Sequence, residues 1–357
     1  MLVPPGRRAS SWRSCLSIGL LVAGVYFMPD AAAENLSPVQ AISPPESGFY
    51  AKELDYRGLK IKAPVVVSDQ ALIEARRRLD LMLHTMANAL ANLTAEGAEL
   101  HIIGKDQNTS DLPEHRGAKG KPFDGDLTID ERTRGLGGLF ASCGEENLLR
   151  LPKDRYLGRD ICLHEFAHTL MDYGLDNAIR ARIEDQYHSS KARGLWQTMY
   201  AGSNSKEFFA ELTMWYFGTR GDYGHLAPAP LPGKQWLISY DPAACKLLDD
   251  IYSGRLVPTK TQVVDVEASP PSRESSLKSL NADHATTLRL MNMTAQPVKV
   301  YWLDYQGSRK PYGQIAPYGR QLQNTYVSHP FLLTDNNEVG LAIFVAVPEA
   351  GRGTLHP

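Results

Sequence analysis

The stretch His164-Glu165-Phe166-Ala167-His168 decides most of what this sequence predicts. On a helix the two histidines are four residues apart and leave the same face, so both imidazoles can converge on one metal ion. Glu165 lies beside them, where its carboxylate can accept a proton from water at the metal. The pattern H-E-x-x-H is typical of zinc hydrolases and predicts one zinc ion per chain. The alternative is a surface helix with two histidines that bind nothing.

Composition limits the classes of protein to consider. The chain has 357 residues, of which 43% are hydrophobic and 22% charged, an ordinary globular composition with room for two domains. The formal net charge of −2 provides no basic footprint, so nucleic acid is not expected as a partner.

The first 33 residues are predicted to be a signal peptide. The features that carry this prediction are Arg7, Arg8 and Arg13, an apolar stretch from Cys15 to Met28, and the small residues Ala31-Ala32-Ala33. We therefore expect a secreted or periplasmic protein with no membrane segment after cleavage; an uncleaved anchor is the alternative. The three remaining cysteines are expected to be structural or free: Cys143, Cys162 and Cys245.

The mature chain is predicted to hold an α+β domain over residues 34–256, a flexible linker over 257–283 and a small antiparallel β-sandwich over 284–350. Expected strands cover residues 65–67 and 100–103, and expected helices cover residues 68–93, 158–173, 177–193, 205–217 and 241–252. A leader rich in Pro and Ser is expected up to Gly48. The long stretch 104–145 is expected to contain an edge strand near the metal and part of a substrate cleft.

A hydrolytic zinc site needs a third protein ligand and an open position. The continuation H-x-x-G-x-x-H is excluded, because Met171 and Gly174 stand at its last two fixed places. His188 has no supporting neighbours. Glu207 is the better candidate, because Glu207 and Glu211 share a helix face beside two phenylalanines, and two carboxylates together need a cation. The first would bind zinc and the second would accept the free N–H of a ligand histidine. A pair of solvated glutamates is the alternative.

The segments His-Glu-Phe-Ala-His and Glu-Phe-Phe-Ala-Glu together resemble the catalytic domain of the lethal-factor group of gluzincin peptidases, over about residues 158–217. The resemblance implies a zincin-like fold with His164, His168 and Glu207 as zinc ligands and Glu165 as general base. It also implies that Tyr200, seven residues before Glu207, stabilises the oxyanion. Glu165 would then take a proton from the attacking water and pass it to the leaving amine.

Residues 285–348 resemble the β domain of the von Hippel–Lindau family, on the segment Val300-Tyr301-Trp302-Leu303-Asp304-Tyr305-Gln306-Gly307 and the residues that follow. In that family the sandwich binds 4-hydroxyproline in a peptide. The resemblance places such a pocket at Trp302, Tyr312, Thr325, His329 and Phe331, with Thr and Phe replacing the family's Ser and Trp. The family's helical domain has no counterpart in this sequence, so no ubiquitin-ligase assembly is expected. The alternative is that Trp302 and Phe331 are core residues.

These observations together predict a secreted zinc endopeptidase. Its C-terminal module would target a protein or peptide substrate, with hydroxyproline-containing proteins as the candidate class. Two alternatives stay open: a zinc amidase that acts on a non-peptide or cell-wall amide, and a binding protein whose metal domain is structural.

Overall fold

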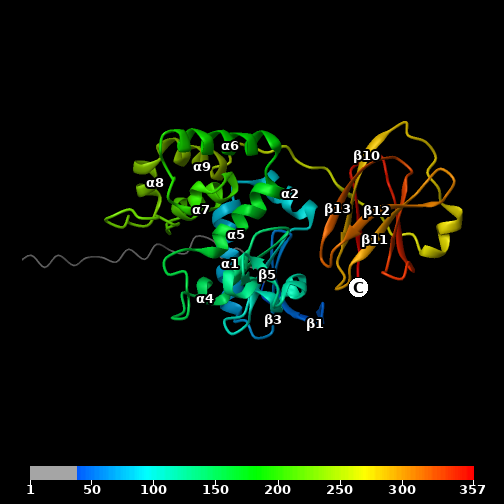
Figure 1. Cartoon of the computed structure of the whole chain (residues 1–357), viewed down its shortest axis with the longest axis horizontal. Coiled ribbons are helices and arrows are strands. Elements are labelled where there is room, and N and C mark those ends of the chain that lie inside the picture. The colour runs from blue at the N-terminus through cyan, green and yellow to red at the C-terminus, as the bar shows by residue number, and fades with distance from the viewer. Residues whose placement is uncertain (1–37) are drawn as a thin grey trace, which may run out of the picture. The chain divides into compact units, whose positions relative to one another are not determined.

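The computed structural model describes residues 38–357, and the signal peptide predicted over residues 1–33 lies outside them. No helix in the described part of the chain has the length and apolar content that a membrane span requires. A mixed α+β region is followed by a β-rich C-terminal region (Figure 1), as predicted.

The α+β region is organised around a six-stranded mixed sheet. Its strands, in spatial order, are β1 (Gln40–Glu46), β2 (Tyr50–Tyr56), β3 (Leu59–Pro64), β4 (Glu99–Ile103), β8 (Phe140–Gly144) and β7 (Gly135–Leu136). The pairs β3–β4 and β4–β8 are parallel, and the other pairs are antiparallel. The strand predicted at residues 100–103 is β4. The edge strand expected within residues 104–145 is β7, which pairs only with β8.

The N-terminal strands correct the sequence prediction. β1 lies in the segment expected to be an irregular leader. The strand predicted at residues 65–67 is wrong, because Val65 and Val66 are 69% and 64% exposed in a turn between β3 and the first helix. β2 and β3 place lysines and acidic residues among the apolar ones, which hides the strand pattern. Lys62, for example, pairs with Glu46 and Glu99, each at 2.8 Å.

The long helix predicted over residues 68–93 is two helices, α1 (Asp69–Leu83) and α2 (Ala87–Glu96). Ser68 caps α1 as expected, because its side chain accepts a hydrogen bond from Gln70 N. The helix is interrupted between Leu83 and Ala87, where the Thr85 hydroxyl donates to Tyr252 O at 2.6 Å. The predicted apolar face is nevertheless buried, and each large side chain on it contributes roughly 1.5–3 kcal/mol.

The metal motif lies on α5 (Ile161–Thr169), which begins three residues later than predicted because Asp160 supplies the cap. Asp160 Oδ1 accepts from Leu163 N at 3.1 Å, and Oδ2 accepts from Arg150 and Arg78 at 2.9 and 3.1 Å. A π-helical turn at Leu170–Gly174 follows the helix. Figure 1 shows the next helices grouped beside α5: α6 (Asn177–Ala192), α7 (Ser205–Tyr216), α8 (Lys234–Tyr240) and α9 (Pro242–Tyr252). Of these four helices, only α8 was not predicted.

Short elements connect these parts of the α+β region. They are β5 (Pro122–Asp124), β6 (Leu127–Thr128), α3 (Ile129–Arg132) and α4 (Glu145–Leu148). Single 3-10 turns cover Thr109–Asp111, Pro113–Ala118 and Tyr200–Gly202. The cysteines Cys143, Cys162 and Cys245 are free and buried.

The C-terminal region contains two four-stranded sheets. One has β13 (Arg320–Tyr326), β10 (Ala285–Asn292), β16 (Gly351–Leu355) and β9 (Val264–Asp265); the other has β12 (Arg309–Ile315), β11 (Val298–Leu303), β14 (Pro330–Thr334) and β15 (Gly340–Val345). Their shared core includes Leu288, Val300, Phe331 and Phe344. The domain is less purely antiparallel than predicted, because β16 pairs in parallel with β10 and β9.

The segment predicted as a flexible linker, residues 257–283, is largely held in place. Thr259 N donates to Asp176 Oδ2 at 2.7 Å, and Thr261 N donates to Asn92 Oδ1 at 2.6 Å. Further on, β9 pairs with β16, and a 3-10 turn at Pro271–Ser276 places Glu274 against Arg309. Polar residues here bond to fixed backbone and ionic partners, which their composition alone does not reveal.

The cap of α5 gives a stability prediction. We expect Asp160→Ala to lower the free energy of unfolding by about 3 kcal/mol, because it removes the cap and leaves Arg78 in a buried site without that partner. Urea denaturation measures the change. Asp69→Ala is the control, since Asp69 is exposed and its pair with Lys52 is worth less than about 1 kcal/mol. Equal losses in the two variants would contradict this account.

Candidate metal centre

Three side chains from two helices meet at one point. Nε2 of His164 lies 3.2 Å from Nε2 of His168, and Glu207 Oε2 lies 3.2 Å from the first and 3.4 Å from the second. The two histidines come from α5 and Glu207 from α7, whose cap Asn204 accepts from Glu207 N at 2.9 Å. Within residues 38–357 this is the one group of three His, Cys, Asp or Glu side chains close enough to hold a metal ion.

The spacing and chemistry of these atoms fit a tetrahedral zinc ion. Ligand atoms placed about 2.0–2.1 Å from zinc lie about 3.3 Å from one another, which matches the three measured separations. Glu207 Oε2 is buried and has no hydrogen-bond partner in the described part of the chain. A buried carboxylate oxygen without a donor is costly, and a cation at this point would satisfy it. The three residues could therefore hold the ion.

Electrostatics favours positive charge in the site. Burial alone would raise the pKa of Glu207, but His164 and His168 together hold that pKa well below its usual range. Burial would lower the pKa of His164, but Glu207 and Glu211 outweigh it and raise this pKa to about 10. The carboxylates thus attract a proton to His164 when no metal competes for it.

Glu211 lies behind the ligands and is fully buried. Its Oε1 is 3.1 Å from His164 Nδ1, so His164 presents Nε2 to Glu207 and His168. Arg159 Nη2 donates to the same oxygen, and the backbone N of Asp222 donates to Oε2. Burial raises the pKa of Glu211, but His164, Arg159 and the Asp222 N–H lower it further, so the carboxylate stays ionised. The predicted second carboxylate therefore does face a candidate ligand.

Glu165 and His168 are approached by the backbone of the sheet edge. A Cβ on Gly137 would lie 2.5 Å from His168 Cβ, and a Cβ on Gly135 would lie 3.0 Å from Glu165 Cγ. Burial raises the pKa of Glu165 above its usual value, although both histidines oppose the shift. Strand β7 therefore runs directly beside the triad of candidate ligands, His164, His168 and Glu207. In the described sheet, β7 is an edge strand, so no strand pairs with its outer side.

Tyr200 lies at the mouth of the site and is 36% exposed. Its ring centroid is 6.3 Å from that of His164, and Arg132 Nη2 donates to its hydroxyl at 3.4 Å. The backbone N of Tyr200 donates to Asp222 Oδ2 at 2.8 Å, which fixes the 3-10 turn. Burial and Glu207 raise the pKa of Tyr200, and Arg132 lowers it. The hydroxyl therefore remains protonated at neutral pH and can donate.

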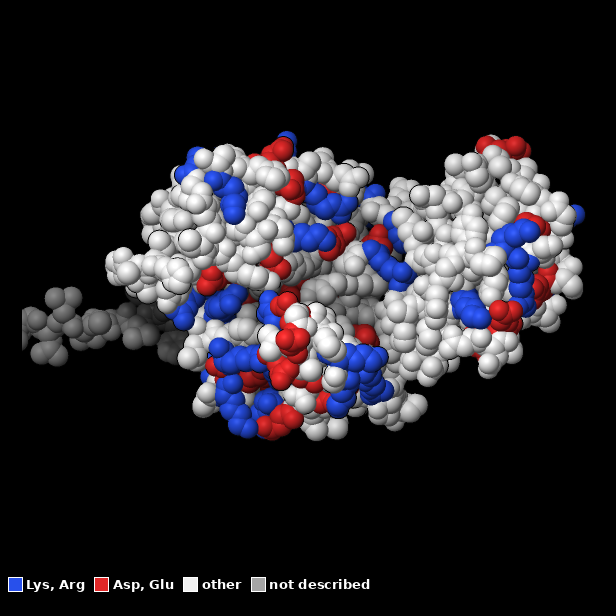
Figure 2. Space-filling model, in the orientation of Figure 1, with Lys and Arg blue, Asp and Glu red and all other residues white. Residues whose placement is uncertain are grey.

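A cavity of about 390 Å³ adjoins the triad, and its walls include Arg132, Tyr156, Arg159, Glu165, Tyr200 and Asp222. The arginines, Tyr156 and Asp222 were missed in the sequence, since none stands in a recognisable motif. On the face shown in Figure 2, basic and acidic side chains are interspersed over the α+β region. Any preference for a charged substrate must therefore come from the individual residues that line the cavity.

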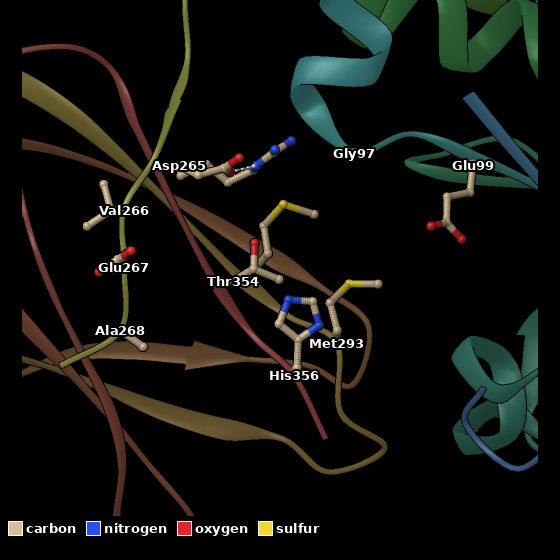
Figure 3. Close-up of a pocket in the computed structure, with 11 residues that line it drawn as sticks. Gly97, Glu99, Asp265, Val266, Glu267, Ala268, Met293, Thr354 and His356 are labelled. Carbon is tan, nitrogen blue, oxygen red and sulfur yellow. Dashed lines mark hydrogen bonds and ion pairs between the residues drawn. The ribbon is translucent and has the colours of Figure 1, made fainter. Parts of the chain in front are cut away.

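Other candidate positions lack the features of the triad. His188 is exposed on α6 and pairs with Glu184 at 2.9 Å, far from any third ligand in the described residues. A second cavity of about 490 Å³ is lined by Glu99, Asp265, Met293, Thr354 and His356, among others (Figure 3). Among the residues that line this second cavity, Asp265 forms an ion pair with Arg352 at 2.7 Å.

The five residues predicted to form the β-domain pocket lie together. Trp302 and Phe331 are direct neighbours on β11 and β14, and the Tyr312 ring lies 6.1 Å from Trp302 and 5.6 Å from Phe331. His329 is 5.3 Å from Trp302, and its Nδ1 is 3.1 Å from Thr325 Oγ1. Phe331 is only 1% exposed, so it packs in the core, whereas Tyr312 is 44% exposed.

The protonation of His329 follows from its partners. Its Nε2 lies 2.9 Å from the carbonyl oxygen of Asn281, so Nε2 carries the hydrogen. Burial lowers the pKa of His329, which leaves the ring neutral and Nδ1 an acceptor for the Thr325 hydroxyl. Ser279, which the sequence did not single out, accepts from Trp302 Nε1 at 2.7 Å.

Comparison with known proteins agrees with the β-rich region. Residues 277–343 match the family model described as the VHL beta domain. This confirms the C-terminal resemblance and moves its start into the segment predicted as linker. The match covers less than half of the chain, and no curated protein matches the sequence.

The raised pKa of His164 gives a prediction for metal binding. Near pH 7 the metal-free site holds a proton on His164, so Zn²⁺ should release about one proton and bind about tenfold more tightly per pH unit up to about pH 10. Calorimetric titration in buffers of different protonation enthalpy measures the release. His188→Gln should behave as wild type, whereas His164→Gln should bind weakly without this proton. Binding that is independent of pH would contradict the assignment.

Proposed function

We propose that this protein is an exported zinc-dependent endopeptidase of the gluzincin type, with a zincin-like catalytic domain. The observation that carries the proposal is the close meeting of His164 and His168 with Glu207, at separations suited to zinc, beside Glu165 and Tyr200. Zinc in that position would acidify a bound water towards a pKa of about 7 and polarise a substrate carbonyl.

Glu165 would be the general base. Its pKa is raised by burial, which brings it closer to neutral pH and makes it able both to accept a proton and to give it back. Glu165 and His164 both line the cavity beside the candidate metal ligands. In this proposal Glu165 takes the proton from the attacking water and delivers it to the leaving amine.

Tyr200 would stabilise the negative oxygen that develops on the carbonyl. Its protonated hydroxyl lies at the mouth of the site, next to Arg132. One such donor typically lowers the barrier by roughly 3 kcal/mol.

The unpaired edge of β7 supports an extended substrate. β7 is the last strand of the sheet, and Glu165 lies against Gly135, whose backbone N and O are bonded to Thr133 Oγ1. A peptide added along this edge would carry its carbonyls past the catalytic residues by ordinary strand pairing. This is the reason to favour a peptide over a compact amide as substrate.

The proposal predicts that Glu165→Gln retains zinc and loses about 10²–10⁴-fold in kcat. Metal analysis and cleavage of casein, collagen and peptidoglycan fragments provide the measurements. Glu184→Gln is the control, since Glu184 is exposed and lies on α6. An active Glu165→Gln protein would refute the mechanism. Turnover of peptidoglycan alone would favour the amidase. Zinc binding without any turnover would favour a structural metal.

We propose a second role for the β domain, the capture of hydroxyproline-containing peptides. A ligand hydroxyl could replace the contact between Thr325 and His329, donating to Nδ1 and accepting from the threonine. Trp302 and the exposed ring of Tyr312 would flank the pyrrolidine ring. Proline would leave Thr325 and His329 bonded to each other, so the preference comes from the additional hydrogen bond that the ligand hydroxyl makes, roughly 0.5–1.5 kcal/mol.

Full-length Glu165→Gln protein, which should bind without cutting, tests this role. We expect a hydroxyproline peptide to bind about two- to tenfold more tightly than its proline counterpart, and Thr325→Val to remove the difference. Thr354→Val is the control, because Thr354 is a threonine of β16, outside the five-residue set. Fluorescence anisotropy measures the affinities. Equal binding of both peptides to the unsubstituted pocket would rule out hydroxyproline recognition.

A further inference from the structure

We propose that the cavity beside the triad is a specificity subsite for an acidic side chain of the substrate, and that Arg132 selects it. The inference rests on the proposed peptidase function and adds the class of residue that the enzyme prefers. It is carried by the hydrogen-bonding character of the walls, which hold more unused donors than unused acceptors.

Arg132 is the principal donor. Its Nε donates to Asp124 Oδ2 at 2.7 Å, and its Nη2 donates to the Tyr200 hydroxyl at the long distance of 3.4 Å. The Asp124 side chain is 60% exposed, so water screens its charge. Nη1 has no hydrogen-bond partner among residues 38–357. The guanidinium therefore enters the cavity with spare donors and little compensation of its charge.

Two other wall residues add donors. The Tyr156 oxygen accepts from Arg134 N at 3.1 Å and from Arg155 Nη2 at 3.4 Å, and its own hydrogen has Thr133 Oγ1 as a weak acceptor at the long distance of 3.5 Å, which a ligand acceptor could replace. Arg159 donates to Glu211 through Nη2, but its Nε is buried and has no partner in the described residues. Both side chains line the same cavity as Arg132.

Most acceptors of the cavity are already assigned, although Asp222 Oδ1 has no hydrogen-bond partner in the described residues. Asp222 Oδ2 accepts the N–H of Tyr200, and Glu165 is the proposed base. A ligand that enters must therefore bring acceptors. A carboxylate suits this best, because an arginine fork binds its two oxygens in one plane and the charge strengthens each bond. An aliphatic side chain would displace water from these donors without providing a hydrogen-bond acceptor.

Cleavage-site profiling of a peptide mixture tests the proposal. With the zinc-loaded full chain, we expect Asp and Glu to be enriched at one fixed position beside the cleaved bond. A matched peptide pair with Glu or Gln at that position should differ about tenfold or more in kcat/KM. Arg132→Glu should reverse the preference towards Lys, and Arg132→Gln should abolish it, with zinc content unchanged in both.

Arg182→Glu is the matched control. Arg182 is exposed on α6, and its replacement by Glu changes the net charge by the same amount as Arg132→Glu. The Arg182→Glu enzyme should therefore keep the preference for acidic residues. Cleavage without acidic enrichment, or an unchanged preference in both Arg132 variants, overturns the subsite and leaves the peptidase intact. No cleavage of any peptide by the zinc-loaded chain overturns the proposed function, and the subsite with it.

Discussion

A carboxylate that is completely removed from water, that of Glu211, holds the candidate metal centre together. It links α7 to His164 on α5, to Arg159 before that helix and to the loop that follows α7. A buried charge without partners costs several kcal/mol, so each of these groups is constrained by the need to satisfy it. The orientation of His164 and the path of the chain near Tyr200 both follow from that constraint.

Local patterns in the sequence were enough to locate the three residues of the candidate metal centre. The four-residue spacing of His164 and His168 fixes their common face on any helix, and the spacing of Glu207 and Glu211 does the same on α7. Asn204 and Asp160 cap these helices, and the sequence prediction began α5 three residues too early because it did not identify Asp160 as the cap. What spacing could not supply was the approach of the two helices, which depends on packing between residues far apart in the chain.

The parts that escaped prediction depend on partners distant in sequence. Lys62 and its glutamates make a charged segment a strand, and Asn92 holds backbone at Thr261 that composition alone marks as flexible. Arg132 reaches the cleft from the end of the short helix α3, which carries no motif. In the β domain the residues named from the resemblance do lie together, yet Phe331 is buried in the core and Ser279 comes from the supposed linker.

The close passage of the sheet edge over α5 bears on how variants of this protein should be interpreted. Gly137 has no side chain and offers no ligand atom, yet any larger residue there would meet the Cβ of His168 within 2.5 Å. Either the loop or the imidazole would have to move. In a mutational scan, substitutions of Gly137 should therefore have effects like those of His164 and His168. Even alanine at this position would disturb the candidate metal centre.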